Sequence, residues 1–298
     1  MAKRVKREPG WFRHSAAVRK HIAPVPPDLP RGRGGVWAIT MVKDEADIIE
    51  TVVRHLLAQG IERVLVADNL SSDGTEAILG RLARTEPVTV LTDRLTQYFQ
   101  AEKMTHLARQ AARAGAGWVL PFDADEIWLA PEGTLASWLG RCPADVVQAT
   151  VFNHVPTPHD DESEPDPVRR LRWRKRDPNR LHKVAFRAHR RARLAYGNHG
   201  VTRRGGRTGG LQVRHFPYRS EEQFIRKFHQ GAQSFVGTGF GPDKGRVWRG
   251  LGSLDTEGLR AAWRTLVETQ NLPIDWMEMP REGLVDDPAP LQRLDPTP

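Results

Sequence analysis

The sequence predicts an α/β fold with a mostly parallel central sheet, helices on both faces and a small mixed C-terminal part. Two observations carry this prediction. Short apolar runs alternate with amphipathic helical segments four times between residues 36 and 125. The connections between these segments are short. Alternation of strand and helix with short connections is typical of a parallel sheet covered by helices.

The first repeat begins with VWAITMV at residues 36–42, an apolar and partly β-branched run that is typical of a buried parallel strand. Asp44 is a plausible N-cap for the helix that follows, and Gly60 is suited to end it. Between them, apolar residues recur at helical spacing. We therefore expect a strand over 36–42 and a helix over about 44–60.

The same pattern continues to residue 125. Strands are expected over 63–68, 88–93 and 118–125, and helices over 71–84 and 101–115. Ligands of open α/β sheets bind at the carboxyl ends of the strands, so the residues that follow each strand are candidate site residues.

After residue 130 the alternation stops. We expect a strand over 145–155, a polar loop over 156–167 and short antiparallel strands over 168–216. Two helices complete the order, over 219–235, opened by Ser220, and over 258–269. These elements form the mixed C-terminal part of the predicted fold.

Composition divides the chain into three parts. Residues 1–34 are basic and then rich in proline and glycine, which favours a flexible arm and linker. Residues 35–270 have the composition of one globular domain. Residues 271–298 are rich in proline and have little apolar periodicity, so we expect a loose tail.

Several classes of protein are excluded by composition. The chain has 298 residues, of which 39% are hydrophobic, and no apolar run approaches the roughly 18 residues of a membrane-spanning helix. The basic N-terminus lacks the apolar core of a signal peptide. Cys142 is the single cysteine, which rules out an internal disulfide and a cysteine-based metal cluster. A reducing cytoplasm is the expected compartment.

The net charge of +9 is unevenly spread. Residues 1–34 contain nine Lys and Arg against two acids, and residues 169–207 contain fifteen against one. The rest of the chain is acidic. Basic segments of this kind favour contact with polyanions or with an anionic membrane surface.

The clearest chemical motif is Asp123-Ala-Asp125-Glu126, at the end of an apolar strand. Two carboxylates one residue apart can reach the same hard cation where a strand breaks into a turn. A divalent cation bound there would bridge a diphosphate and neutralise charge on a leaving phosphate.

The order of elements and motifs resembles the family 2 type glycosyltransferases with the GT-A fold, in particular the family 2-like branch with a D-A-D-E variant of the DxD motif. The resemblance covers roughly residues 36–236. The motifs that carry it are ITMVKDEADIIE, ADNLSSDGTEAIL, WVLPFDADEIW, GNHGV and HFPYRSEEQFIRKFHQG.

The resemblance implies a nucleotide-diphosphate sugar donor, with a UDP-sugar favoured, and Mn²⁺ or Mg²⁺ as cofactor. Thr40, Glu45 and Asp68 would contact the nucleotide. Asp123 would contact the ribose and the metal's water shell, Asp125 would bind the metal directly, and His215 would complete its sphere. Residues 35–130 would then be the nucleotide-binding half, 131–236 the half that recognises the acceptor and completes the metal site, and 237–270 a helical end.

Transfer of a sugar to a hydroxyl needs cations for the diphosphate and a base for the acceptor proton. Lys103 and Lys183, with Arg180 and Arg219, are the candidate cations. Glu126 is the first candidate base because it adjoins the metal acids. Further candidates are Asp160, Asp161 and His199. The resemblance implies inversion at the anomeric carbon, which needs one such base.

The acceptor is expected to be a glycan, a lipid-linked molecule or a small molecule with a hydroxyl, and the acidic loop at 159–167 is the candidate region for its recognition. The basic segments suggest peripheral contact with the inner membrane face.

Two alternatives remain open. A sugar nucleotidyltransferase would also use a doubly wound sheet and a carboxylate-bound metal, but ITMVKDEAD lacks the glycine-rich phosphate loop expected after its first strand. A basic nucleic-acid-binding protein would use the basic segments. No helix-turn-helix, finger or aromatic RNA-binding motif is present, so a specific nucleic acid is not expected.

Overall fold

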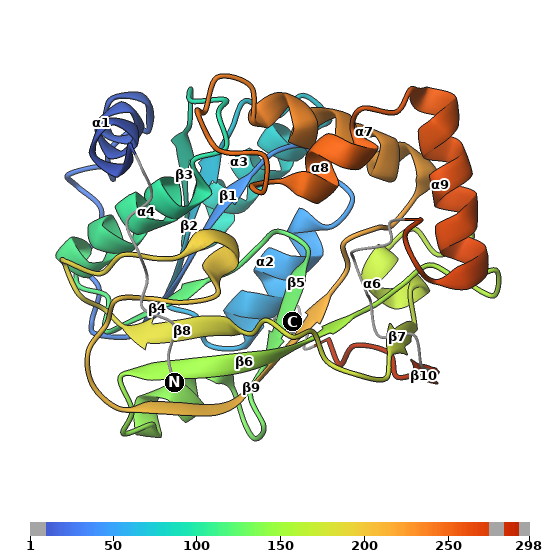
Figure 1. Cartoon of the computed structure of the whole chain (residues 1–298). Helices are drawn as coiled ribbons and strands as arrows, with labels where there is room; N and C mark the ends of the chain where they lie inside the picture. Colours follow the sequence, from blue (N-terminus) through green and yellow to red (C-terminus); the bar gives the residue numbers. More distant parts are fainter. Residues whose placement is uncertain (1–9, 274–282, 292–298) are drawn as a thin grey trace.

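The computed structural model describes residues 10–273 and 283–291, and all structural statements below concern these residues (Figure 1). The helices are α1 (Trp11–His21), α2 (Ile49–Ala58), α3 (Thr75–Thr85), α4 (Gln100–Ala114), α5 (Leu135–Arg141), α6 (Pro167–Arg170), α7 (Glu221–Ser234), α8 (Arg246–Leu251) and α9 (Thr256–Thr269), with a 3-10 turn η1 (Tyr196–Asn198). The strands are β1 (Val36–Val42), β2 (Arg63–Asp68), β3 (Val88–Thr92), β4 (Trp118–Pro121), β5 (Glu126–Leu129), β6 (Val146–Asn153), β7 (Trp173–Lys175), β8 (Lys183–Arg187), β9 (Arg207–His215) and β10 (Leu284–Asp286).

One eight-stranded sheet organises the molecule, in the order β3-β2-β1-β4-β8-β6-β9-β5. Strands β3, β2, β1 and β4 are parallel, which confirms the doubly wound half predicted from the sequence. The carboxyl ends of β1 and β2 therefore lie side by side, with Val42 opposite Asp68.

The second half of the sheet is mixed. Strand β8 is antiparallel to both β4 and β6, as expected for this region. Strand β9, however, runs parallel to β6 and antiparallel to β5. The expectation of antiparallel strands alone over 168–216 is therefore incomplete, because the chain crosses over between β6 and β9 instead of returning through a hairpin.

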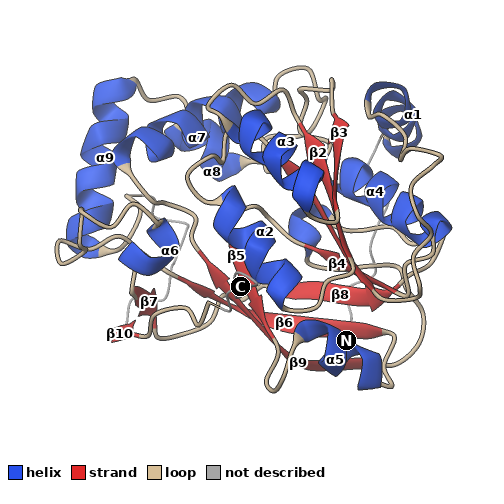
Figure 2. Ribbon diagram, turned by 180° about the vertical axis from the view of Figure 1, so that it is seen from behind, coloured by secondary structure: helices blue, strands red, loops and turns tan. Residues whose placement is uncertain are grey.

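Helices cover both faces of the sheet, as predicted. On β1, Ala38 belongs to the apolar cluster that contains the buried residues of α2 and α3. Its neighbours Trp37 and Ile39 belong to a second cluster with α1 and α4. Alternate side chains of a strand point to opposite faces, so a strand such as β1, which is apolar except for Thr40, has to be covered on both faces. Figure 2 shows this arrangement from behind.

A third apolar cluster joins α7, α8 and α9 beside the sheet. Phe224 and Phe228 of α7 are fully buried in it, together with Leu259 and Leu266 of α9. Ser220 caps α7 by accepting a hydrogen bond from the Gln223 N–H, as its position in the sequence predicts. This cluster holds the opposite face of α7 over the carboxyl ends of β1 and β2.

The expectation of a flexible arm over residues 1–34 is wrong for residues 11–22. Residues 11–21 form helix α1, which lies beside α4 (Figure 1). Trp11, His14 and Val18, spaced at three and four residues, are buried against the domain. Ile22 continues this contact through a bridge to Asp93. Burial of Trp11 and Val18 stabilises this helix, although the basic composition of the segment suggested a flexible arm. Residues 1–9 lie outside the described part of the chain.

The tail is also partly ordered. Residues 284–286 form β10, which pairs with β7, and Asp287 forms ion pairs with Arg174 at 2.7 Å and with Arg214 at 2.9 Å. The expectation of a loose tail over 271–298 is thus wrong for these residues, while residues 274–282 and 292–298 lie outside the described ranges. Within residues 10–273 and 283–291, every helix is too short or too polar to span a bilayer.

Candidate functional site

A cavity of about 180 Å³ lies where α7 covers the carboxyl ends of β1 and β2. Its walls come from the ends of these strands, the loop at 96–98, the polar face of α7 and two aromatic residues beyond it. The residues that line it are Met41, Lys43, Asp44, Glu45, Asn69, Thr96, Gln97, Tyr98, Lys103, Gln223, Arg226, Lys227, Gln230, Gly231, Ser234, Phe235 and Trp248. The cavity is thus at the edge of the sheet where the sequence placed a ligand.

Asp44 anchors the floor of this cavity. It is not the N-cap of α2, which begins at Ile49, so that expectation is wrong. Asp44 instead has a left-handed backbone, with φ 54°, and its carboxylate is bound from two sides. One oxygen accepts the Ser72 N–H at 2.6 Å, and the other accepts the side-chain amide of Gln230 on α7. The Asp44 N–H donates to the Ser71 hydroxyl at 3.0 Å.

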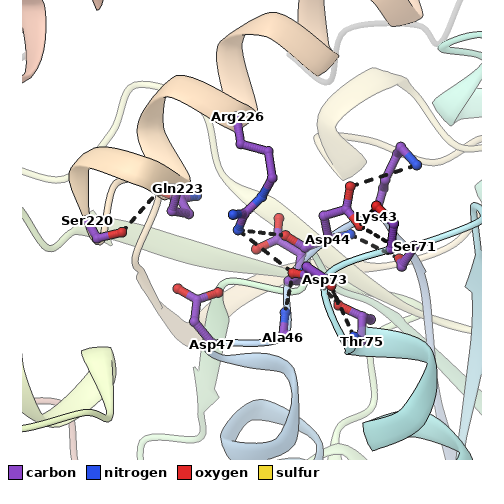
Figure 3. A network of polar contacts seen from close by, with 12 residues as sticks. Lys43, Asp44, Ala46, Asp47, Ser71, Asp73, Thr75, Ser220, Gln223 and Arg226 are labelled. Atoms are coloured by element: carbon purple, nitrogen blue, oxygen red, sulfur yellow. Dashed lines mark hydrogen bonds and ion pairs between the residues drawn. The ribbon is translucent and has the colours of Figure 1, made fainter. Parts of the chain in front are cut away.

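Asp73 fixes the neighbouring turn (Figure 3). Its carboxylate accepts hydrogen bonds from the Ala46 N–H at 3.0 Å and from the Thr75 hydroxyl at 2.6 Å. Arg226 of α7 points toward this group, with its guanidinium 3.8 Å from Asp73 and 3.4 Å from the Asp44 carbonyl oxygen. Burial would raise the pKa of Asp73, but the hydrogen bonds from Thr75 and Ala46 lower it below its usual value.

Aromatic rings form another wall. The rings of Tyr98 and Phe235 lie 4.7 Å apart, and Trp248 also lines the cavity. Tyr98 continues the wall toward the D-A-D-E turn, because its hydroxyl donates to Gln100, whose amide lies 3.4 Å from Asp123. An aromatic wall of this kind offers a stacking surface for a flat ring. Trp128, unlike Trp248, is fully buried in the core and does not line the cavity.

Asp125 lies behind α7 among three basic groups. Its carboxylate is 2.6 Å from the Lys227 ammonium, 3.4 Å from His215 Nε2 and 3.7 Å from the Arg219 guanidinium. Burial alone would raise the pKa of Asp125, but Lys227, His215 and Arg219 hold it well below its usual value. The carboxylate is therefore charged at neutral pH.

Asp123 and Glu126 share one buried lysine. The ammonium of Lys183 contacts Asp123 and lies 2.7 Å from Glu126. The second oxygen of Glu126 accepts hydrogen bonds from the Asp123 N–H and from the Trp128 indole N–H. Asn198 donates to the other oxygen of Asp123 at 3.0 Å. Burial raises the pKa of Glu126, against the attraction of Lys183. Glu126 is fully buried, so this arrangement suits support of the turn better than contact with an acceptor.

Two of the other predicted cations, Lys103 and Arg219, have acidic partners of their own. Lys103 is buried and pairs with Asp93 at 2.6 Å. Arg219 is fully enclosed, binds both oxygens of Asp47 and contacts Glu45. Both cations hold neighbouring segments together at the edge of the sheet.

The remaining predicted residues are dispersed. Thr40 is fully buried, with its hydroxyl on the Met41 carbonyl oxygen, and Asp68 accepts hydrogen bonds from Ser71. Asp161 lies on the exposed loop and binds Ser163, while Asp160 binds Thr157. His199 lies next to Asn198 and contacts the His182 carbonyl oxygen at 2.9 Å. Burial lowers the pKa of His199 to about 4, so its imidazole is neutral at neutral pH.

Sequence reasoning assigned no role to Lys227, Gln230, Arg226 or Asn198. Lys227 and Gln230 lie on α7, at a helical spacing from Gln223 and Ser234. These four residues of α7 all line the cavity. A polar stripe on a helix whose opposite face is aromatic was the signal that could have identified them. Asn198 stands in the GNHGV motif, and its position gave no indication of a contact with Asp123.

Two of the three predicted metal ligands are arranged together. His215 Nδ1 lies 2.9 Å from Asn153 Oδ1, and this contact orients the ring so that Nε2 faces Asp125 Oδ1 at 3.4 Å. A carboxylate and an imidazole are donors that suit Mn²⁺ or Mg²⁺. Asp123 is directed toward Lys183 and Asn198 instead, and no set of three acidic, histidine or cysteine side chains in the described ranges is arranged to hold a metal. Asp125 and His215 are therefore two donors, of the kinds that suit a divalent cation, on neighbouring parts of the site.

Comparison of the chain with solved structures gives distant likenesses. One is TarS 1–349 of S. aureus in complex with UDP, at 13% identity and a TM-score of 0.39, covering 72% of this chain and 69% of that one. The same protein in complex with UDP-GlcNAc matches at 12% identity and a TM-score of 0.40, covering 80% and 74%. Glucosyl-3-phosphoglycerate synthase from Mycobacterium tuberculosis, in complex with Mn²⁺, UDP and phosphoglyceric acid, matches at 15% identity and a TM-score of 0.28, covering 50% and 49%.

A search of curated proteins gives no match. The family model of glycosyl transferase family 2 matches residues 37–196, more than half of the chain. The matched segment contains β1 to β4, the D-A-D-E turn and the beginning of η1. The chain therefore belongs to glycosyl transferase family 2, has the expected GT-A type fold and is a glycosyltransferase.

Proposed function

We propose that this glycosyltransferase moves a sugar from a nucleoside diphosphate sugar, with UDP as the favoured nucleotide, to a hydroxyl acceptor. The observation that carries the proposal is the composition of the cavity under α7. It combines an aromatic wall, amide and carboxylate groups on the β1 and β2 ends, and the cations Lys227 and Arg226. A base and ribose need the first two, and a diphosphate needs the cations. Family membership favours this function over the nucleotidyltransferase and nucleic-acid-binding alternatives.

We propose that Asp125 and His215 hold Mn²⁺ or Mg²⁺ when the donor is bound. The cation would supply positive charge to the leaving diphosphate. Arg219 and Lys227 keep Asp125 ionised, and Asn153 orients His215. Asp123, held by Lys183 and Asn198, is better placed to accept hydrogen bonds from a ribose than to bind the cation directly.

For the acceptor proton we propose His199 ahead of Glu126 and Asp161. Both oxygens of Glu126 are engaged in the buried turn, and Asp161 lies on the exposed loop. His199 follows Asn198, which contacts Asp123. Its Nδ1 lies 2.9 Å from the His182 carbonyl oxygen, which leaves Nε2 as the nitrogen that can accept a proton. With one base the reaction would be a single displacement that inverts the anomeric carbon.

The acceptor is proposed to be a glycan or a lipid-linked molecule, because one face of the protein is strongly basic. Burial lowers the pKa of His106, and the nearby Arg113 and Arg109 of α4 and Arg19 of α1 lower it further in the same direction, to about 4. The Arg109 guanidinium also donates to the Ala192 carbonyl oxygen, which brings the segment 188–207 to this face. That segment contains no acidic residue. We propose that this basic face contacts an anionic membrane surface.

The proposed function is tested by incubating the protein with a panel of nucleoside diphosphate sugars and Mn²⁺, with water as the acceptor of the sugar, and by measuring release of the nucleoside diphosphate. We expect the wild type to consume one donor and Asp125→Asn to consume none. His199→Gln should bind this donor and consume it at least about 100-fold more slowly. If the folded wild type binds and consumes none of the donors, the proposal is wrong.

A further inference from the structure

Lys227 separates the cavity from Asp125. Its side chain lines the cavity and retains 17% of its exposure, whereas the Asp125 side chain retains 5% and does not line the cavity. The ammonium lies 2.6 Å from Asp125 Oδ2, a distance that indicates a charge-assisted hydrogen bond. A ligand in the cavity therefore meets Lys227 before it meets Asp125.

The two cations on Asp125 differ in their freedom to move. Arg219 is fully enclosed and is fixed by Asp47, by Glu45 and by the Phe216 carbonyl oxygen at 3.0 Å. Lys227 reaches Asp125 from a partly exposed position on α7, on a flexible stem of four carbons. Rotation of this stem would direct its ammonium into the cavity, while Arg219 would remain where it is.

A divalent cation and the Lys227 ammonium compete for the same carboxylate. An ammonium hydrogen-bonded to Asp125 Oδ2 neutralises the carboxylate, and it repels at short range a cation that binds the other oxygen, Oδ1. His215 Nε2, on the other side of the carboxylate, offers its lone pair to the cation. Entry of the cation between Asp125 and His215 is thus favoured when Lys227 leaves.

We propose that Lys227 neutralises Asp125 in the free protein and moves to the diphosphate of the donor when the divalent cation binds. The movement of Lys227 to the diphosphate rests on the proposed function. The diphosphate gives the ammonium a new partner of opposite charge, so nucleotide and cation each increase the affinity for the other. Lys227 therefore couples the two binding events.

The first test measures Mn²⁺ binding without nucleotide, from the electron paramagnetic resonance signal of free Mn²⁺. We expect Lys227→Met to bind Mn²⁺ about tenfold more tightly than the wild type, because the competing charge is gone. Arg226→Met is the matched control. It removes one positive charge from the same helix and cavity, but Arg226 contacts Asp73 and not Asp125. Arg226→Met should change the Mn²⁺ affinity by about threefold or less.

The second test measures UDP binding by calorimetry in the presence of chelator and then of Mn²⁺. In the wild type, Mn²⁺ should increase the UDP affinity by about tenfold or more. In Lys227→Met this coupling should be at least about threefold smaller, because only the direct contact between Mn²⁺ and the diphosphate remains. Thermal unfolding of each variant establishes that it is folded.

The inference is overturned if Lys227→Met is folded and binds Mn²⁺ with unchanged or lower affinity, since Lys227 would then only tether α7 to the sheet. Failure of the proposed function gives a different pattern. In that case the wild type binds no nucleoside diphosphate, yet Lys227→Met still gains Mn²⁺ affinity.

Discussion

The Asn198 side chain donates to Asp123 Oδ1 at 3.0 Å and so connects the turn η1 to the D-A-D-E turn. Asn198 is fully buried and has a left-handed backbone, with φ 57°. Asparagine adopts this conformation more readily than most residues and adds a donor at its end. The motif GNHGV thus provides both the backbone and the amide that hold one oxygen of Asp123, while Lys183 holds the other.

The Asn198 contact can be separated from its backbone role. Asn198→Gly removes the amide without backbone strain, whereas Asn198→Ala also places a side chain in the left-handed region, which costs about 1 kcal/mol more. We expect both variants to bind the donor more weakly and Asn198→Ala to be the less stable, as measured by calorimetry and urea unfolding. Unchanged donor affinity in Asn198→Gly would show that Asn198 does not position Asp123.

The buried pair of Lys103 and Asp93 is expected to be structural. Lys103→Met leaves the Asp93 carboxylate buried without its cation and should lower the free energy of unfolding by about 3 to 5 kcal/mol. The double variant Lys103→Met/Asp93→Asn removes both charges and should recover much of this loss in urea unfolding. If Lys103→Met instead keeps its stability and loses only nucleotide affinity, Lys103 is a donor-binding residue.

His154 makes stability depend on pH. Burial lowers its pKa to about 3, so the folded protein keeps this side chain neutral, whereas in the unfolded chain it gains a proton below about pH 6.5. The stabilisation is complete above that pH and is lost as the pH falls toward 3, at about 1.4 kcal/mol per pH unit.

His154→Asn keeps a donor for the Leu171 carbonyl oxygen but does not titrate. We therefore expect the gap in unfolding free energy between wild type and variant to shift in favour of the variant from about pH 7 to about pH 5. A constant gap over this range would show that His154 is protonated in the folded protein.

The basic face is expected to bind anionic vesicles. Arg19→Glu/Arg113→Glu reverses two exposed charges on this face and should abolish sedimentation with anionic vesicles at low salt. Arg81→Glu/Arg84→Glu makes the same change in net charge on α3 and should sediment as the wild type does. If the wild type sediments equally with neutral and anionic vesicles, the membrane proposal is wrong.

Local pattern predicted the first half of the fold well. The strands from β1 to β4 are apolar on both faces, and each is separated from the next by one amphipathic helix, so periodicity and short connections were sufficient. The parallel pairing of β6 with β9 was not predictable in this way, because it depends on which strands meet after a long crossover. The spacing of Trp11, His14 and Val18 did contain a helix signal, which the basic composition concealed.

The site was predicted in part for a similar reason. The acids of the D-A-D-E turn are adjacent in the sequence, and the sequence therefore places them together. Their partners are not adjacent to them. Lys183 follows Asp123 by 60 residues and Lys227 follows Asp125 by 102, and only the packing of β8 and α7 brings these pairs together. Lys183 was therefore assigned to a diphosphate, and Lys227 received no role.

The most direct test of the account is calorimetric titration of nucleoside diphosphates and their sugar conjugates, with Mn²⁺ and with chelator, into the wild type, Asp125→Asn and the exposed control Asp28→Asn. The account predicts that one nucleoside diphosphate binds the wild type and the control at least about tenfold more tightly with Mn²⁺, and that Asp125→Asn loses this dependence. Absence of binding in folded wild type, or binding that neither chelator nor Asp125→Asn alters, would contradict it.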